Sequence, residues 1–163
     1  MDGVAIKGHV DTLLISPDGV ETRVDGGSNT VSYACADAVA RLFAGRGGGP
    51  KRIVFACGSS SLGDPFNLED SQRSQDRATI LGSDLTGYDV DIEPNPITDK
   101  SGDAYAGNVV RLRATLTTSS STYIYGYLLE DAAGNVLAAR RLSTKISKPA
   151  GYGISALWSI TFT

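Results

Sequence analysis

The segment Val110-Arg111-Leu112-Arg113-Ala114-Thr115-Leu116-Thr117 decides the fold class of this chain. Its apolar residues alternate with polar ones, which is the pattern of a β-strand with one face buried and the other in water. A helix would instead place apolar residues three or four positions apart. The segment therefore predicts a strand in a sheet that covers an apolar core.

The residues that follow this strand keep the β pattern to the end of the chain. Residues 119–121 are three serines and indicate a turn, and residues 123–129 form the next expected strand. Residues 131–135 predict a hairpin loop, because the glycine in Asp-Ala-Ala-Gly-Asn accepts the backbone conformation that a tight turn needs. Residues 136–143 form the expected return strand of this hairpin. The last expected strand carries alternate apolar side chains on one face: Ile154, Ala156, Trp158, Ile160 and Phe162.

The residues that precede the strand also predict β structure. Residues 4–25 form an expected hairpin around the turn Ser16-Pro17-Asp18-Gly19, and Gly26-Gly27-Ser28-Asn29 is expected to break its second strand. Residues 53–57 are continuously apolar, which predicts a strand buried on both faces. Residues 88–93 alternate apolar and acidic side chains and predict a further strand.

One helix is expected, over residues 30–44. Six apolar residues recur there at helical spacing and predict one buried stripe: Val31, Cys35, Ala38, Val39, Leu42 and Phe43. Asn29 or Thr30 is the expected N-cap, and Gly45 ends the helix. Asp37 and Arg41 lie four residues apart and are expected to pair on the wet face.

These segments together predict a mainly β fold, an antiparallel β-sandwich that is jelly-roll-like and has one covering α-helix. A single domain over residues 1–163 is expected, because the length suits one core and no repeat divides the chain. Residues 58–85 are polar and irregular, apart from a short helix that residues 72–77 could form. Long irregular stretches of this kind are often functional or mobile.

Composition narrows the range of functions. Charged residues make up 20% of the chain, its net charge is −3 and no long stretch is strongly basic, so neither nucleic acid nor an anionic membrane is an expected partner. No apolar run approaches the roughly 20 residues that a membrane-spanning helix needs. Residues 1–4 lack the features of a secretory signal. Cys35 and Cys57 form no metal or redox motif, so two free thiols are expected in a chain folded in a reducing cytoplasm.

No catalytic, cofactor-binding or metal-binding residues are predicted. His9 lies in an expected strand with no marked partner, which favours an ordinary strand residue over a general base. Residues 58–63 miss the spacing of a nucleophile elbow, and residues 45–51 follow a helix rather than a strand, which is the wrong order for a phosphate loop. Residues 89, 91 and 93 are acidic and share one strand face. A solvated acidic face explains them better than a calcium site does.

Tyr123, Tyr125 and Tyr127 are the most informative polar-aromatic set. A period of two places all three on one face of one strand. Two interpretations have equal weight: the tyrosines pack inside the sandwich, or they form a protein interface. Stacking on sugars is a weaker alternative.

The order of several segments resembles small β-rich virion structural proteins of tailed bacteriophages, of the tail-fibre, baseplate or head-attached type. The resemblance is carried by five segments, of which the first and the last are the most specific: Ala40–Gly45, Ile53–Gly58, Gly126–Asp131, Leu137–Arg140 and Ala156–Thr163. It implies a non-enzymatic structural protein, made in the host cytoplasm and located in the virion. The tail, fibre or baseplate region, attachment to the head, and a role as a capsid decoration (cement) protein all stay open.

The expected partners are other virion proteins and further copies of this chain. The strands at residues 53–57 and 123–127 are apolar on both faces, whereas a sandwich covers only one face, so a homo-oligomer is expected. The preference for a trimer comes from the resemblance. A carbohydrate- or receptor-binding module with a host glycan as its ligand is the alternative from another class, and an enzyme is the weakest.

Overall fold

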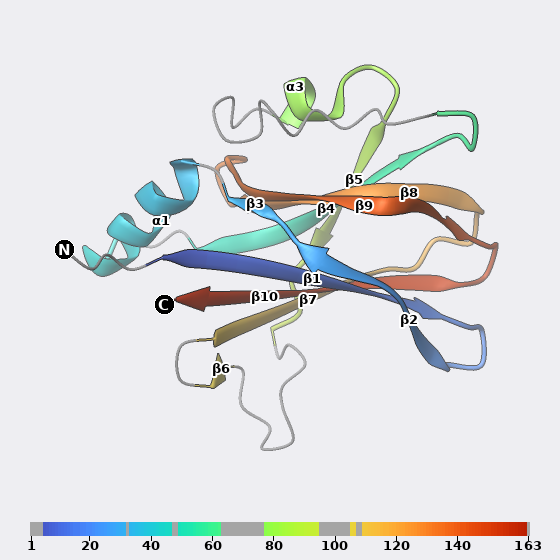
Figure 1. The fold of residues 1–163 in the computed structure, drawn as a ribbon, viewed down its shortest axis with the longest axis horizontal. Coiled ribbons are helices and arrows are strands. Elements are labelled where there is room, and N and C mark those ends of the chain that lie inside the picture. Colours follow the sequence, from blue (N-terminus) through green and yellow to red (C-terminus); the bar gives the residue numbers. More distant parts are fainter. Residues whose placement is uncertain are drawn as a thin grey trace.

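The computed structural model describes residues 5–31, 33–46, 49–62, 77–94, 105–106 and 109–162. These residues form two five-stranded antiparallel sheets, one above the other in Figure 1, with helices α1 (Tyr33–Phe43) and α3 (Arg77–Leu81) outside them. The predicted mainly β, sandwich-like fold is confirmed. The expectation of one helix was incomplete, because α3 is a second.

Each sheet combines strands from both halves of the chain. The lower sheet in Figure 1 has the order β2-β1-β10-β7-β6, with β2 at Glu21–Ser28, β1 at Ile6–Ile15, β10 at Gly153–Phe162, β7 at Val109–Leu116 and β6 at Tyr105–Ala106. The upper sheet has the order β3-β9-β8-β4-β5, with β3 at Thr30–Val31, β9 at Val136–Lys148, β8 at Thr122–Asp131, β4 at Pro50–Gly58 and β5 at Thr86–Asp91.

The main core fills the space between the sheets. Trp158 from β10 and Phe55 from β4 are both fully buried there. Phe55 meets Tyr127 edge to face, with ring centroids 5.2 Å apart. The Tyr127 hydroxyl lies 2.8 Å from the Thr12 hydroxyl of the opposite sheet, which gives this buried phenol a hydrogen-bond partner. Three residues of the apolar face predicted for the last strand, Ile154, Ala156 and Trp158, lie in this core, and Ile160 packs against it.

A second apolar layer covers the outer face of the upper sheet. Residues 53–57 are all buried, as predicted, because alternate side chains of β4 face the core and this outer layer. The outer layer is closed by Ile80 and Leu81 of α3, by Leu85 and by the partly buried Leu62. The chain itself therefore covers the second face, which the sequence interpretation left to a partner chain.

Two expectations near the N-terminus were wrong. Gly26 and Gly27 do not break the strand: β2 continues to Ser28 after a register shift against β1. Thr30–Val31 is not the first helical turn but the short strand β3, paired with Ala138 and Ala139 of β9. Since the sheet satisfies the backbone groups of these two residues, the helix begins only at Tyr33, and Thr30 is not its cap.

The turns predicted at residues 16–19 and 131–135 are confirmed. Gly19 has φ +88°, and its N–H donates to the carbonyl of Ser16 over 2.9 Å. Gly134 also has φ +88°. The Asp131 carboxylate accepts hydrogen bonds from the backbone N–H groups of Ala133 and Asn135 at 3.0 and 2.9 Å, which stabilises the hairpin loop.

Candidate functional site

The three tyrosines of β8 do not share one face. Tyr127 lies in the core between the sheets, whereas Tyr123 and Tyr125 belong to the outer layer. The register of β8 against β9 shifts between Ile124 and Gly126, and such a β-bulge inverts the alternation of side chains. The predicted stripe was therefore wrong, because a bulge leaves no trace in a period-two pattern.

Gly126 explains why the bulge falls at this point. A Cβ atom on Gly126 would lie 2.2 Å from the carbonyl oxygen of Arg140, a distance that no side chain tolerates. The neighbouring backbone of β9 thus approaches β8 more closely than any other residue would permit. The sequence marker of the bulge is this one glycine in an otherwise apolar strand.

The chain itself covers Tyr125. Its side chain is 4% exposed, and its hydroxyl donates to the carbonyls of Ser59 and Leu62, the latter at 3.1 Å. Tyr127 has no exposed surface. Only the partly exposed Tyr123 retains surface for a partner. Replacing Tyr125 with Glu would therefore disrupt the fold, so it does not test an interface.

Two of the three acidic residues in and just after β5 lie close to an arginine, Asp89 to Arg77 and Glu93 to Arg113. Asp89 lies 2.8 Å from Arg77, while Glu93, beyond the end of β5, accepts a hydrogen bond from Thr115 at 3.2 Å. Asp91 is exposed. Within the described ranges, no three histidine, cysteine or carboxylate side chains gather closely enough to hold a metal ion.

His9 lies on the outer face of the lower sheet. Its Nε2 atom is 3.0 Å from Asp11, and the same carboxylate oxygen accepts a hydrogen bond from Arg23 at 2.9 Å. The side chain of His9 is 48% exposed. This arrangement is a solvated surface ion-pair group, and exposed pairs of this type contribute little to stability.

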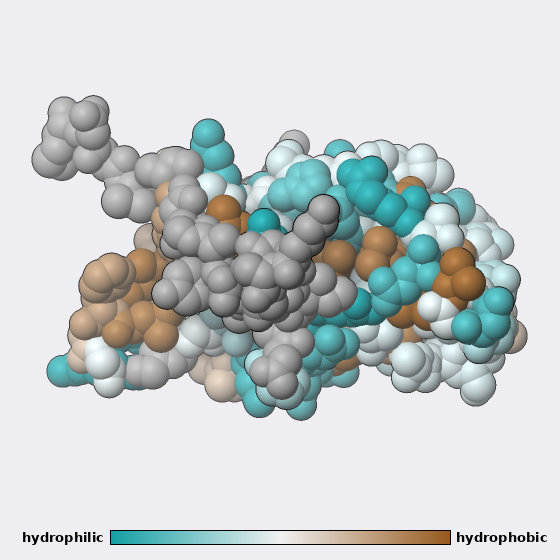
Figure 2. All heavy atoms as spheres, turned by 90° about the horizontal axis from the view of Figure 1, so that it is seen from below, coloured by the Kyte–Doolittle hydropathy of each residue, from teal (hydrophilic) through white to brown (hydrophobic). Residues whose placement is uncertain are grey.

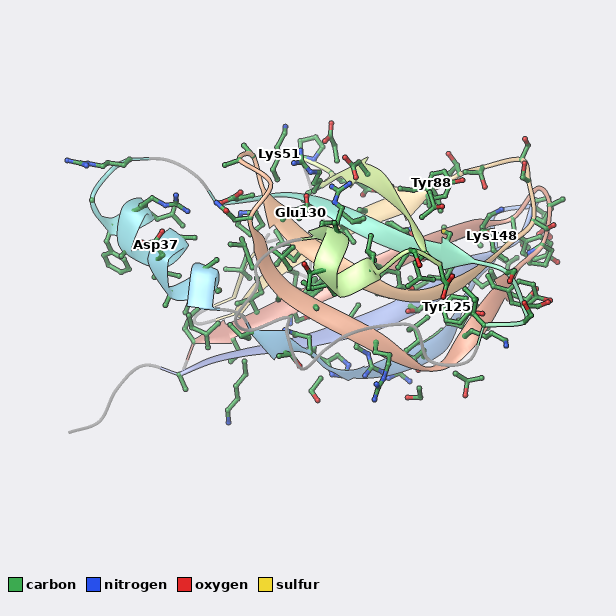
Figure 3. The ribbon with its side chains drawn as sticks, turned by 90° about the horizontal axis from the view of Figure 1, so that it is seen from above. Asp37, Lys51, Tyr88, Tyr125, Glu130 and Lys148 are labelled. Carbon is green, nitrogen blue, oxygen red and sulfur yellow. The ribbon has the colours of Figure 1, made fainter. Side chains whose placement is uncertain are left out.

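A buried carboxylate fixes α3 to the upper sheet. Glu130 is fully buried, and Arg77 binds both of its oxygens, at 2.8 and 2.7 Å. Arg52 donates a further hydrogen bond at 3.0 Å, and Figure 3 shows Glu130 beside α3. These hydrogen bonds with Glu130 raise the pKa of Arg77. The Glu130 group is therefore structural, because its charge is neutralised within the fold.

The helix end of the molecule carries an exposed apolar surface. Phe43 is 90% exposed and Leu42 is 48% exposed, so the C-terminal part of the predicted buried stripe was wrong. The buried apolar contacts of α1 come from its first part, where Ala34 and Ala38 pack against Leu137. Figure 2 shows apolar surface at the end of the molecule where α1 lies.

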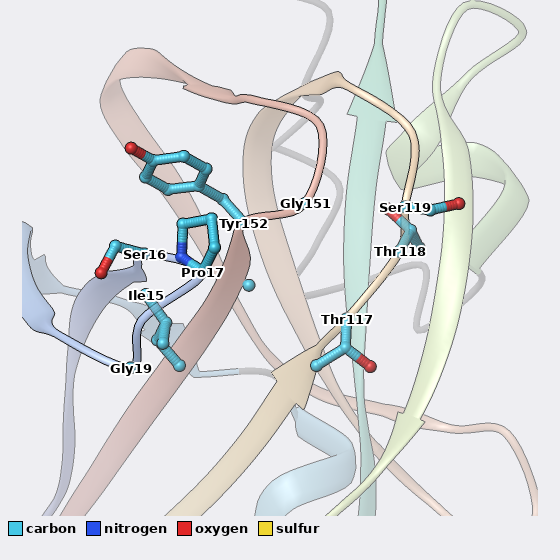
Figure 4. A pocket seen from close by; sticks show the side chains of 10 residues that line it. Ile15, Ser16, Pro17, Gly19, Thr117, Thr118, Ser119, Gly151 and Tyr152 are labelled. Atoms are coloured by element: carbon cyan, nitrogen blue, oxygen red, sulfur yellow. The ribbon is translucent and has the colours of Figure 1, made fainter.

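The opposite end carries an open hollow of about 450 Å³. Three connections form it: the β1–β2 turn, the β7–β8 connection and the β9–β10 connection (Figure 4). Its lining comprises Ile15, Ser16, Pro17, Gly19, Thr117, Thr118, Ser119, Gly151, Tyr152 and Gly153. None of these side chains is charged. We call this site the loop-end hollow.

A buried lysine joins the loops around this hollow. Lys148 has no exposed surface, and its ammonium donates to the carbonyls of Thr118, Pro149 and Tyr152 at 2.9, 3.2 and 2.9 Å. Burial lowers the pKa of Lys148. Nothing in the sequence marks Lys148 as buried, since a lysine at the end of a strand ordinarily lies in solvent.

No protein-family model, no curated protein and no solved structure matches this chain. Neither α1 nor α3, the helices in the part of the chain that the structure describes, has the length and apolar character that a bilayer-crossing helix requires.

Proposed function

We propose that this chain is a non-enzymatic structural protein, which works by assembling with copies of itself and with other proteins of a tailed-phage particle. The exposed apolar end of α1 carries the proposal. Leu42 and Phe43 lie on the last helical turn, where water contacts most of the Phe43 ring. A large exposed aromatic side chain gains free energy when a partner covers it, and burying one contributes about 2 kcal/mol.

A further copy of this chain suits the helix end as its partner. Exposed charges lie on both sides of the apolar pair in the sequence. The acidic Asp37, 70% exposed, precedes the pair, and the basic Arg46, also exposed, follows it. Copies related by a closed symmetry axis place Phe43 beside Phe43 and bring Asp37 of one copy toward Arg46 of the next. The trimer remains the preferred stoichiometry, by virtue of the sequence resemblance.

Light scattering coupled to size exclusion tests self-assembly. At micromolar concentration, we expect a particle of about three times the 17.0 kDa chain mass. Phe43→Ser should give a monomer with the far-UV circular dichroism spectrum of the wild type, because the exposed ring contributes little to the isolated fold. Val20→Ser is the matched control, since Val20 is 57% exposed in the β1–β2 turn, and it should stay assembled. A monomeric wild type, or an assembled Phe43→Ser variant, would contradict the proposal.

The place of the chain in the particle requires a separate measurement. Electron microscopy of phage particles with this protein labelled should show the label on the tail, fibre or baseplate, or at a head attachment site. Label distributed over the whole capsid surface would favour the decoration protein instead. Particles without label would reject the virion assignment and leave self-assembly to be judged by light scattering.

A further inference from the structure

The loop-end hollow has the chemical character of a small-molecule site. The Tyr152 ring and Pro17 supply apolar surface on one side, and Figure 4 shows Thr117, Thr118 and Ser119 across the hollow from them. Thr117 and Ser119 are exposed, and among the described residues the side-chain hydroxyls of Thr117, Ser119 and Tyr152 have no hydrogen-bond partner in the protein. A ligand would therefore meet apolar faces and unused hydroxyl groups together.

We propose that the loop-end hollow binds a neutral saccharide. Sugars combine an apolar C–H face with a rim of hydroxyl groups, so a Tyr ring contacts the first and Thr or Ser hydroxyls bind the second. The volume of about 450 Å³ lies within the range of ordinary ligand sites.

The charges around the hollow favour a neutral ligand over an acidic one. The Lys148 ammonium directs its three hydrogen bonds to backbone carbonyls and is fully buried, so it does not reach the hollow. At the rim, the Asp18 carboxylate accepts a hydrogen bond from the Ser16 hydroxyl, which lowers the pKa of Asp18 and keeps it ionised. An acidic sugar would therefore approach a negative charge with no cationic side chain in the lining.

The hollow is held in shape before any ligand arrives. Lys148 ties the Thr118 carbonyl to the carbonyls of Pro149 and Tyr152, which joins two of the three walls. The Gly151 N–H also donates to the Ser119 carbonyl at 3.3 Å. Ordering these loops costs nothing at the moment of binding, and such preorganisation raises affinity.

This inference does not rest on assembly through α1. The loop-end hollow and α1 lie at opposite ends of the sandwich in Figure 1, and Figure 3 shows Asp37 of α1 and Lys148 toward opposite ends. An assembled particle could therefore present several hollows at once, and that multivalency would increase apparent affinity for a glycan-coated surface.

The test begins with a glycan array that holds neutral hexose, deoxyhexose and N-acetylhexosamine oligosaccharides beside sialylated and sulfated ones. The full chain is applied as an antibody-linked multimer, so that weak binding is detected even if the chain is monomeric. Titration calorimetry with the neutral trisaccharide that binds most strongly then compares the variants. Tyr152→Ala should weaken binding about tenfold or more, and Thr117→Val, which removes one hydroxyl at nearly constant volume, about threefold or more.

Tyr88→Ala is the matched control. Tyr88 is 45% exposed on β5 and lies outside the hollow, so this variant should bind within about twofold of wild type. Circular dichroism on each variant confirms that it folds. The proposal would be overturned if the protein bound no neutral glycan on the array or bound acidic glycans alone. Equal affinity of the Tyr152→Ala and wild-type proteins would also overturn it. None of these outcomes bears on self-assembly.

Discussion

Cys57 shows how far burial changes a single side chain. Its thiol lies in the core between the sheets and is 3% exposed. Desolvation by burial raises the pKa of Cys57 from its ordinary value of 9.0 to about 11, against a smaller lowering by a hydrogen bond with Thr122. A thiol of this kind stays protonated at neutral pH and reacts slowly while the protein is folded.

Stability should therefore fall as pH rises from about 9 to about 11. In this window the unfolded chain releases the Cys57 proton while the folded chain retains it, so ionisation favours unfolding, by about 3 kcal/mol at most. Denaturant unfolding at several alkaline pH values should give a shallower decline for Cys57→Ala than for wild type. Tyr127 and Lys148 interact electrostatically with Cys57, so the difference between the two slopes includes the loss of these two interactions. Equal slopes would contradict the shifted pKa.

Tyr127 and Gly126 mark the limit of prediction at the residue scale. The strand that contains them follows from its β-branched and aromatic residues, and its burial on both faces follows from the absence of polar alternation. The face of Tyr127 does not, because it depends on a bulge whose cause is the Arg140 backbone on another strand. Non-local contacts of this kind are invisible in a local period.

At the scale of elements, the attachment of α3 depends on one buried ion-pair group. Glu130 is bound by Arg77 from α3 and by Arg52 from β4, so the helix is joined to the sheet by charge as well as by Ile80 and Leu81. Removing one partner of a buried charge is costly, since the remaining charge stays desolvated.

Arg77→Leu should lower the free energy of unfolding by about 2–3 kcal/mol, because Glu130 loses two hydrogen bonds and, among its partners in the described ranges, keeps the one from Arg52. Chemical denaturation measures this loss, and hydrogen exchange should show faster exchange in residues 77–85. Arg23→Ala is the control: its ion pair with Asp11 is as short, at 2.9 Å, but the Arg23 side chain is 60% exposed. Its loss should stay below about 1 kcal/mol. Equal losses in the two variants would show that Glu130 does not hold α3.

The sequence predicts the helix α1 but not what surrounds it. Apolar residues at helical spacing correctly indicated a helix that ends near Phe43. The same spacing predicted burial of Leu42 and Phe43. The structure exposes both, because α1 contacts the sandwich through its first turns and through the Arg41–Asp131 ion pair, and neither contact covers these two side chains. Amphipathic spacing states which side chains share a face, but not whether anything covers that face.

For the whole molecule, local patterns predicted the class but not the assembly of the sheets. The alternation of apolar and polar residues, together with the turn residues, predicted most of the strands. The pairing of β1 with β10 joins residues almost a full chain apart, and nothing in either segment specifies its partner. The loop-end hollow arises only from this long-range order, since its walls come from three distant connections. For this reason, no site at the loop-end hollow could be predicted from the sequence.

The unequal packing of α1 and the sheets predicts two levels of stability in one molecule. The sheets share a large core around Trp158, whereas α1 is held by a small cluster of Ala34, Ala38 and Leu137 and by an ion pair between Arg41 and Asp131. Segments with few buried apolar contacts open locally, without global unfolding. In monomeric protein, the amides of α1 should therefore exchange with a lower opening free energy than those of β8.

Native-state hydrogen exchange on the Phe43→Ser monomer measures this difference, and Leu137→Ala in that background identifies its cause. Leu137→Ala should accelerate exchange in α1 and leave β8 nearly unchanged, whereas Leu129→Ala, a truncation between the sheets, should lower protection throughout. If α1 exchanged only with global unfolding, the two-level picture would be wrong. In assembled wild-type protein, α1 should regain protection, because a partner at Phe43 binds only the closed helix and stabilises it by mass action.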